Sequence, residues 1–224
     1  MGQIYSELDD RLMRFIGEQP MFFVATAPSL TADGAGGHVN VSPKGYRDTL
    51  AIIDPLTVAY LDLTGSGAET IAHVRQNGRI TLMFCSFGRT PKILRIYGTG
   101  QVVLPGDPGW PELAIRFPAA DNYGTDHHGT DPGGTDPGTD PVDADRTAPQ
   151  GTAPQGTARG NQRAIVVVHA ERIADSCGYA VPEMELKRER DLLTKWSERR
   201  SADDLAAYRV KYNTASIDGL PALD

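Results

Sequence analysis

Apolar residues near the N-terminus recur every three to four positions. This spacing places them on one face of a helix, which predicts an amphipathic helix from Gln3 to Ile16. Gly17 and Pro20 follow it, and both residue types commonly end helices. The residues on the predicted apolar face are Ile4, Leu8, Leu12, Phe15 and Ile16.

The residues after this helix form short segments that are rich in β-branched and aromatic side chains. Gly, Pro or Asp bounds each segment, a pattern typical of strands separated by turns. A short helix is expected from Gly67 to Gln76. The pattern therefore favours a β-meander that carries one internal helix and forms a small barrel, which the last strand completes. The predicted strands are Met21–Ala27, His38–Ser42, Leu50–Ile53, Thr57–Leu63, Arg79–Phe84, Ile93–Leu104 and Ala164–Ile173.

The chain changes character between positions 120 and 162. From Gly124 to Gln162 one valine is the only aliphatic residue larger than alanine, and Gly-Thr-Asp occurs four times. Such a segment cannot bury enough apolar surface to offset its chain entropy. We therefore predict a single domain over residues 1–224 with a disordered low-complexity insertion at 120–162. The pair His127–His128 could bind a metal, but two histidines in such a segment are usually incidental, and no metal site is assigned.

Two further helices are expected after the last strand. Residues Glu183–Arg199 form a charged segment with a narrow apolar stripe, and Ala202–Tyr212 carries apolar residues at turn spacing. Amphipathic segments of this kind usually pack against the rest of a molecule. We expect both helices to pack in this way, or at a subunit interface, rather than to bind a ligand.

Charge and composition narrow the class of protein. The net charge of -7 weighs against a nucleic-acid partner, because that role needs a basic surface. No stretch approaches 18 uninterrupted apolar residues, so no membrane span is expected. The first 14 residues mix acidic and basic side chains and do not resemble a signal peptide. Cys85 and Cys177 lie far apart, as reduced thiols of a cytoplasmic protein would.

The first segment with candidate chemistry is the polar strand that begins at His38. Alternation along a strand places His38, Asn40 and Ser42 on one face and Val39 on the other. Lys44 follows just past the end of the predicted strand. A line of polar side chains with one cation suits a phosphorylated ligand. An exposed strand and turn would give the same pattern, so the motif alone leaves both interpretations open.

The second segment, Tyr60–Thr70, runs from a strand through a glycine-rich turn into a helix. Glycines at a helix N-terminus let backbone N–H groups approach an anion closely, and Thr64 and Thr70 add hydroxyl groups. Ser66 and Glu69 have the spacing of a capping box, so they either cap the helix or contact the anion. The segment lacks the P-loop pattern and does not fit the dinucleotide-binding fingerprint.

Taken in order, these segments resemble the pyridoxamine 5'-phosphate oxidase-like superfamily of FMN-binding split barrels. The resemblance lies in Ser42-Pro43-Lys44-Gly45, the strand to Thr64, the helix Gly67-Ala-Glu-Thr-Ile-Ala-His-Val74, and the strands within Asn77–Phe84 and Leu94–Gly100. It implies a mainly β fold, a six-stranded split β-barrel with an internal helix and C-terminal helices. It also implies a homodimer that binds FMN at the subunit interface.

In this family the polar strand His38–Lys44 would line the flavin, and the turn Thr64–Thr70 would hold its phosphate. FMN is therefore the expected cofactor, and the expected partner is a small-molecule substrate. No catalytic residue is assigned, because the flavin itself supplies the redox chemistry. The candidate cofactor-binding residues are His38, Val39, Asn40, Ser42, Lys44, Thr64, Gly65, Ser66, Gly67 and Thr70.

The sequence departs from the family members that oxidise pyridoxine phosphates. Those proteins carry a basic Arg-Lys pair at the start of the internal helix, where this chain has Glu69 and Thr70. Lys44, Arg79 or Arg95 would then have to meet the phosphate. The C-terminal tail also lacks the arginine-containing ending of those oxidases. Both departures weigh against vitamin B6 oxidation.

The resemblance favours an FMN-dependent oxidoreductase that acts on a small organic molecule. A non-catalytic flavin-binding or sensing protein is the alternative from another class. The same fold could also hold a deazaflavin or haem. Haem needs an axial ligand, for which His38, His73 or His169 would be the candidates.

Overall fold

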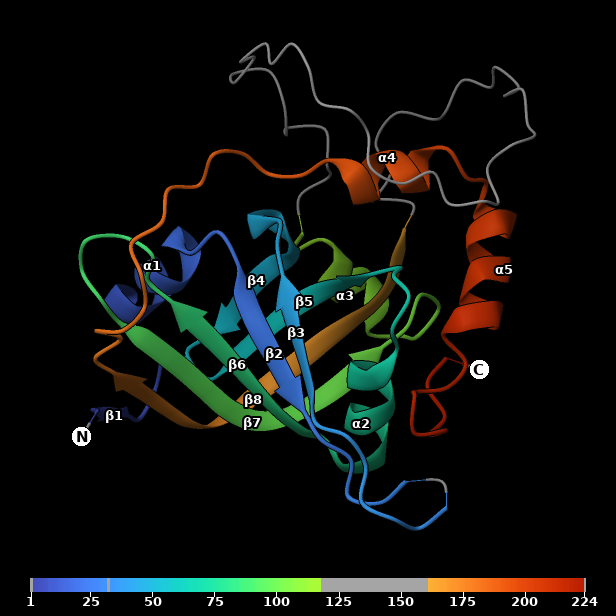
Figure 1. Cartoon of the computed structure of the whole chain (residues 1–224), viewed down its shortest axis with the longest axis horizontal. Coiled ribbons are helices and arrows are strands. Elements are labelled where there is room, and N and C mark those ends of the chain that lie inside the picture. Colours follow the sequence, from blue (N-terminus) through green and yellow to red (C-terminus); the bar gives the residue numbers. More distant parts are fainter. Residues whose placement is uncertain (1, 32, 118–160, 224) are drawn as a thin grey trace.

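The computed structural model describes residues 2–31, 33–117 and 161–223 (Figure 1). The disordered insertion predicted at 120–162 therefore lies outside the described residues, apart from its last two positions. Of these two, Asn161 is buried and Gln162 begins the last strand of the sheet.

The centre of the molecule is one antiparallel sheet in the order β3-β2-β6-β7-β8-β5-β4, with β1 paired to β8. The mainly β architecture is confirmed, but the sheet holds eight strands in the described residues and not six. The strands are β1 (Ile4–Tyr5), β2 (Phe22–Thr26), β3 (Asn40–Lys44), β4 (Leu50–Asp54), β5 (Thr57–Leu63), β6 (Arg79–Cys85), β7 (Ile93–Val103) and β8 (Gln162–Ser176).

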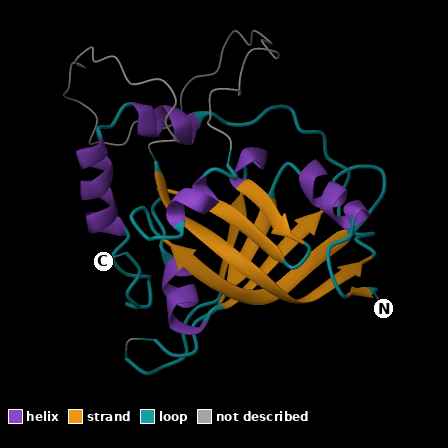
Figure 2. Ribbon diagram, turned by 180° about the vertical axis from the view of Figure 1, so that it is seen from behind, coloured by secondary structure: helices purple, strands orange, loops and turns teal. Residues whose placement is uncertain are grey.

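The two end strands of this sheet, β3 and β4, are consecutive in the chain. Only residues 45–49, which include the short 3-10 helix η1 (Arg47–Thr49), connect them. A connection of this length spans at most roughly 20 Å. The sheet must therefore curl until its two ends come near each other, as Figures 1 and 2 show. Within the described residues β3 and β4 are not paired, so the curled sheet has a gap between them.

The inner face of the curled sheet holds the main core. Aromatic side chains from three strands meet there: Phe22 lies 5.6 Å from both Tyr60 and Phe84, measured between ring centroids. Helix α1 (Asp10–Glu18) covers one end of the sheet and contributes Leu12 and Ile16 to this core. Burial of these side chains provides most of the favourable energy of such a fold.

The helix predicted for Gln3–Ile16 is wrong in its first half. Ile4 and Tyr5 instead pair with β8, and Asp9 caps α1 by accepting a hydrogen bond from the Leu12 backbone N–H at 2.7 Å. A side chain that accepts from the helix's free N–H groups sets where the helix begins. The apolar spacing continued upstream of this cap, which is why periodicity alone placed the start too early.

Helix α2 (Glu69–Asn77) lies at the opposite end of the sheet from α1 (Figures 1 and 2). It ends at Gly78, whose φ of 72° is one that glycine adopts without strain. Its buried residues Ile71 and Ala72 pack with Leu220 and Ala222 of the C-terminal tail. The tail is therefore part of the packed structure. The short helix α3 (Trp110–Ala114) packs with strands β5 and β8.

Two helices follow the sheet, α4 (Leu192–Glu198) and α5 (Ala202–Tyr212). The second matches the prediction, whereas the charged helix predicted from residue 183 begins only at Leu192. Residues 183–191 form neither helix nor strand, and Met184 and Leu186 are exposed there. A helix without a packed apolar face is marginal in water. None of the described helices is long and apolar enough to cross a membrane.

Candidate functional site

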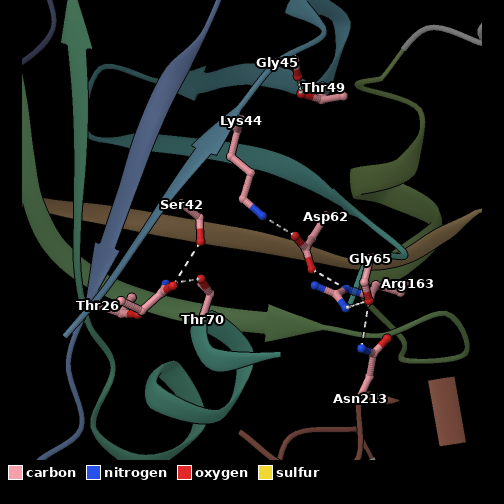
Figure 3. A network of polar contacts seen from close by, with 11 residues as sticks. Thr26, Ser42, Lys44, Gly45, Thr49, Asp62, Gly65, Thr70, Arg163 and Asn213 are labelled. Atoms are coloured by element: carbon pink, nitrogen blue, oxygen red, sulfur yellow. Dashed lines mark hydrogen bonds and ion pairs between the residues drawn. The ribbon is translucent and has the colours of Figure 1, made fainter. Parts of the chain in front are cut away.

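Strand β3 presents its polar side chains to the interior of the curled sheet. Asn40, Ser42 and Lys44 lie opposite inward-facing residues of β2, and residues directly opposite in an antiparallel pair share a face. The Asn40 amide donates to the hydroxyl of Thr70 on α2 at 3.0 Å, and the Ser42 hydroxyl donates to Asn40 Oδ1 at 3.0 Å (Figure 3). The fold thus brings together the two segments that the sequence singled out.

Lys44 belongs to a buried charge cluster. Its Nζ lies 2.7 Å from one oxygen of Asp62, and the Arg163 Nε lies 2.7 Å from the other (Figure 3). The Asp62 side chain is only 1% exposed. Burial by itself would raise the pKa of Asp62, but Lys44 and Arg163 outweigh it, so the pKa lies below its ordinary value. The carboxylate therefore carries its charge at neutral pH.

The glycine-rich turn is held by residues that are distant in sequence. The Thr64 hydroxyl donates to the Asn161 carbonyl at 2.9 Å and accepts from Arg209 Nε at 2.9 Å. The Gly65 carbonyl accepts from the Asn213 amide at 2.9 Å. Thr64 is fully buried, so its hydroxyl supports the turn from within and does not face outward.

Ser66 and Glu69 do not form the capping box that their spacing suggests. The N-cap residue of α2 is Ala68, and no side chain caps the helix there. Ser66 is exposed. A side chain at Gly67 would collide with the Glu69 carboxylate, so that carboxylate folds back over the turn. Because the carboxylate is the far end of a flexible side chain, it could move aside, so this contact does not by itself require a glycine at position 67.

His38 and Val39 lie apart from the polar face of β3. The strand begins only at Asn40. The His38 ring is 78% exposed, and its Nδ1 lies 2.7 Å from the carboxylate of Asp218 in the C-terminal tail. This hydrogen bond lowers the pKa of Asp218. Val39 is 71% exposed and borders a hollow on the outer face of the sheet together with Arg79 and Tyr97.

Arg79 and Arg95, which the sequence offered as phosphate partners, lie on the outer face of the sheet. Each is adjacent in its strand to a residue of the inner core, Ile80 and Ile96 respectively, and side chains alternate between faces along a strand. Within one chain neither arginine can join the group around Asn40. Arg95 instead donates to the Ser176 hydroxyl at 3.1 Å.

Two buried polar atoms beside this group lack a partner among the described residues, the Tyr60 hydroxyl and His73 Nε2. Burial raises the pKa of Tyr60 well above its ordinary value, and it lowers the pKa of His73. Both rings are therefore neutral at pH 7. His73 Nδ1 lies 3.0 Å from the Thr26 hydroxyl, which also accepts from Asn40.

A cavity of about 270 Å³ lies at the end of β3. Its walls are mostly apolar, and Lys44 and Arg47 bring two cations to it. Lys44 therefore borders both this cavity and the polar group on β3. The apolar walls are formed by Ile16, Met21, Phe22, Leu50, Ile52 and Phe84.

The sequence reasoning missed Asp62, Arg163, Arg209 and Asn213. A signal for the first two was present: Asp62 interrupts the apolar strand β5, and Arg163 precedes the apolar run of β8. A charge within a buried strand must have a partner. Arg209 lies in the last turn of α5 and Asn213 is its C-cap residue, and a separation of four residues places both on one side of the helix.

A split β-sheet with a polar strand facing an internal helix is the architecture expected from the sequence, and comparison with known proteins agrees. Residues 8–177 match the family model described as pyridoxamine 5'-phosphate oxidase. The chain is 33% identical over 237 aligned positions to the pyridoxamine 5'-phosphate oxidase family protein ustO of Aspergillus flavus, covering 100% of this chain and 78% of that protein. This chain belongs to the pyridoxamine 5'-phosphate oxidase family.

Solved structures with a similar arrangement include HupZ of Group A Streptococcus and an FMN-binding protein of Syntrophomonas wolfei. HupZ aligns with a TM-score of 0.43 at 17% identity, over 79% of this chain and 98% of HupZ. The FMN-binding protein aligns with a TM-score of 0.38 at 12% identity, over 69% of this chain and 75% of that protein.

Proposed function

We propose that this protein binds FMN and is an FMN-dependent oxidoreductase that acts on a small molecule. The observation that carries the proposal is the meeting of β3 with the start of α2, where Asn40, Ser42 and Thr70 form one hydrogen-bonded group. Membership of a family named for an oxidase supports the same conclusion.

The residues at this place fit a phosphorylated flavin. Asn40 and Ser42 offer an amide and a hydroxyl, and the unpartnered Tyr60 hydroxyl lies buried beside them. Ser66 and Gly67 lie at the N-terminal end of α2, where backbone N–H groups favour an anion. We propose that FMN contacts the polar face of β3 and this turn, supported from within by Thr64 and Gly65. The proposed contacts are therefore Asn40, Ser42, Lys44, Ser66, Gly67 and Thr70, with Thr64 and Gly65 as support, whereas His38 and Val39 lie apart from this face within one chain.

Bound FMN would supply hydride and electron transfer, while the protein orients the reactants and excludes water. Asp62 holds the Lys44 ammonium at 2.7 Å, so that cation is already positioned before any ligand arrives. We propose that the small substrate occupies the apolar cavity that Lys44 borders. A cation at one edge of an apolar pocket would fix the orientation of a substrate there.

We propose that two copies of the chain complete the site. Val39 and Val41 are 71% and 60% exposed at the edge of the sheet, beside the strand that carries the polar group. An exposed apolar edge of this kind is a common interaction surface. We also propose a cytoplasmic location, on the ground that Cys85 and Cys177 are far apart in the sequence.

The proposal is tested by the colour and stability of the purified protein. We expect flavin absorbance, and we expect FMN to raise the melting temperature of flavin-free protein. Asn40→Ala should weaken FMN binding about three- to tenfold, the effect of one lost hydrogen bond, whereas Gln101→Ala on the exposed side of β7 should not. Bleaching by NAD(P)H followed by reoxidation with a substrate would separate an enzyme from a flavin-binding protein.

A colourless protein whose melting temperature ignores FMN would overturn the proposal. A Soret band would indicate haem instead. The side-chain contacts of the three candidate histidines all use Nδ1, which leaves Nε2 of each ring for an axial bond, so the absorbance spectrum decides between flavin and haem. The pairs are His38 with Asp218, His73 with Thr26 and His169 with Thr57.

A further inference from the structure

Two arginines from distant parts of the chain lie against the glycine-rich turn before α2. Arg163, in β8, is bonded to Asp62 and lies 3.3 Å from the Gly65 carbonyl (Figure 3). Arg209, in α5, donates to the Thr64 hydroxyl at 2.9 Å and to the Gln162 carbonyl at 3.0 Å. Both guanidinium groups therefore point at the same few residues.

The charges around this turn do not balance. Lys44, Arg163 and Arg209 bring three positive charges, and Asp62 is the only carboxylate bonded to any of them in the described part of the chain. Arg209 has only neutral partners, a hydroxyl and a carbonyl. Burial lowers its pKa, and the nearby charge of Arg163 lowers it further. Asp62 thus lies between Lys44 and Arg163, whereas Arg209 lies close enough to Arg163 for the two charges to repel each other and has no carboxylate partner among the described residues.

Such an arrangement costs free energy unless an anion completes it. A partly buried cation with neutral partners loses hydration that hydroxyl and carbonyl groups replace only in part. Arginine is also the side chain best suited to phosphate, which its planar fork can bind through two hydrogen bonds. Helix α2 begins with Glu69 and Thr70, so the helix itself brings no positive side chain to the turn.

The contacts of the tail keep α5 in this place. The Asn213 amide is bonded to the Gly65 carbonyl at 2.9 Å, one turn of helix beyond Arg209. Leu220 and Ala222 are buried against α2. These two contacts, which follow Arg209 in the chain, hold its helix beside the turn. Arg209 is therefore positioned before any ligand binds, as a preorganised binding group would be.

We propose that Arg209, supported by Arg163, is the cation that meets the phosphate of FMN, an inference that rests on the proposed function. The positive charge at the phosphate then comes from the C-terminal helix α5 and not from the internal helix α2. Glu69, whose carboxylate folds over Gly67, opposes the phosphate from the same turn.

Riboflavin tests this inference because it lacks the phosphate but keeps the isoalloxazine ring. Affinities of both flavins for flavin-free protein are measured by fluorescence quenching. The Arg209→Gln variant should bind FMN about ten- to a hundredfold more weakly, because it loses one charge-assisted hydrogen bond. Its affinity for riboflavin should not change. Arg209→Lys should recover part of the loss, and Arg199→Gln, an exposed position in the same region, should change neither affinity.

A second variant protects the test against misfolding of Arg209→Gln. Glu69→Gln removes a negative charge near the proposed phosphate, so FMN should bind severalfold more tightly while riboflavin binding is unchanged. Equal losses for the two flavins in Arg209→Gln, or no gain for FMN in Glu69→Gln, would overturn the role of Arg209 and leave the proposed function standing. If the unaltered protein bound neither flavin, the proposed function would fail and this inference with it.

Discussion

Asp62 shows how one residue can organise the polar part of a core. It is almost fully buried, and each of its two carboxylate oxygens is 2.7 Å from a different cation. Removing one member of a buried charge cluster leaves the others without compensation, which costs more than the cluster itself contributes. The strand β5 therefore tolerates a charge at position 62 only because Lys44 and Arg163 reach it.

Asp62→Asn should lower the free energy of unfolding by about 3–5 kcal/mol, since it leaves two cations facing a neutral amide. Urea unfolding followed by circular dichroism measures this difference. Glu183→Gln, at an exposed position, should change the free energy of unfolding by less than about 0.5 kcal/mol. A loss below 1 kcal/mol in Asp62→Asn would contradict the compensation that we infer.

The same cluster sets part of the pH dependence of stability. The pKa of Asp62 is lowered in the folded protein, so the unfolded chain binds more protons as the pH falls below about 4. The contribution of Asp62 is therefore complete above that pH and is lost as the pH falls towards the folded pKa. The Asp62→Asn variant should lack this contribution, so its free energy of unfolding should fall less steeply as the pH is lowered below about 4.

At the scale of elements, strand β3 has two faces with different chemistry. Asn40, Ser42 and Lys44 point inward, whereas Val41 is 60% exposed on the outside. Alternation along a strand produces this division. An edge strand with an exposed apolar face is a site for association, and here it lies directly behind the polar group proposed to bind FMN.

Val41→Glu should shift the protein from dimer to monomer and weaken FMN binding, because it places a charge in the proposed apolar contact. Light scattering after gel filtration reports the mass, and flavin fluorescence reports the affinity. Ile115→Glu, at an exposed apolar residue outside the sheet, is the matched control and should remain dimeric. An unaltered protein that binds FMN as a monomer would show that the dimer proposal is wrong.

At the scale of the whole molecule, the C-terminal tail connects the parts of the candidate site. Arg209 contacts the turn at Thr64, Ala222 packs against α2, and Asp218 is bonded to His38 just before β3. Residues of the C-terminal tail thus contact both candidate segments, the polar strand β3 with the residue before it and the glycine-rich turn before α2. The site and the tail should therefore unfold together.

Removal of residues 124–159 should leave the melting temperature and FMN affinity unchanged. The composition of this segment offers almost no apolar surface to a core, and it lies outside the described residues. Thermal unfolding and flavin titration of the shortened chain check the expectation. Aggregation of the shortened protein, or loss of FMN binding, would show that the segment contributes to the fold.

Much of the fold could be predicted from local patterns. The strands matching β2, β5 and β6 are correct to within a residue or two, because alternation and turn residues are local signals. The start of α1 and the length of α4 were wrong. The first residue of α1 depends on the cap at Asp9, and the first residue of α4 depends on whether Met184 and Leu186 pack against another part of the protein. The periodicity of apolar residues reveals neither.

The amino-acid sequence by itself determined the strands other than β1, the internal helix and two polar segments whose order resembles a flavin-binding family. Only the tertiary structure decided which charged residues meet there. Asp62 and Arg163 are 101 positions apart, and Thr64 and Arg209 are 145 apart. Alternation and spacing act over a few residues, whereas contacts at such separations depend on how the sheet curls and where the tail packs.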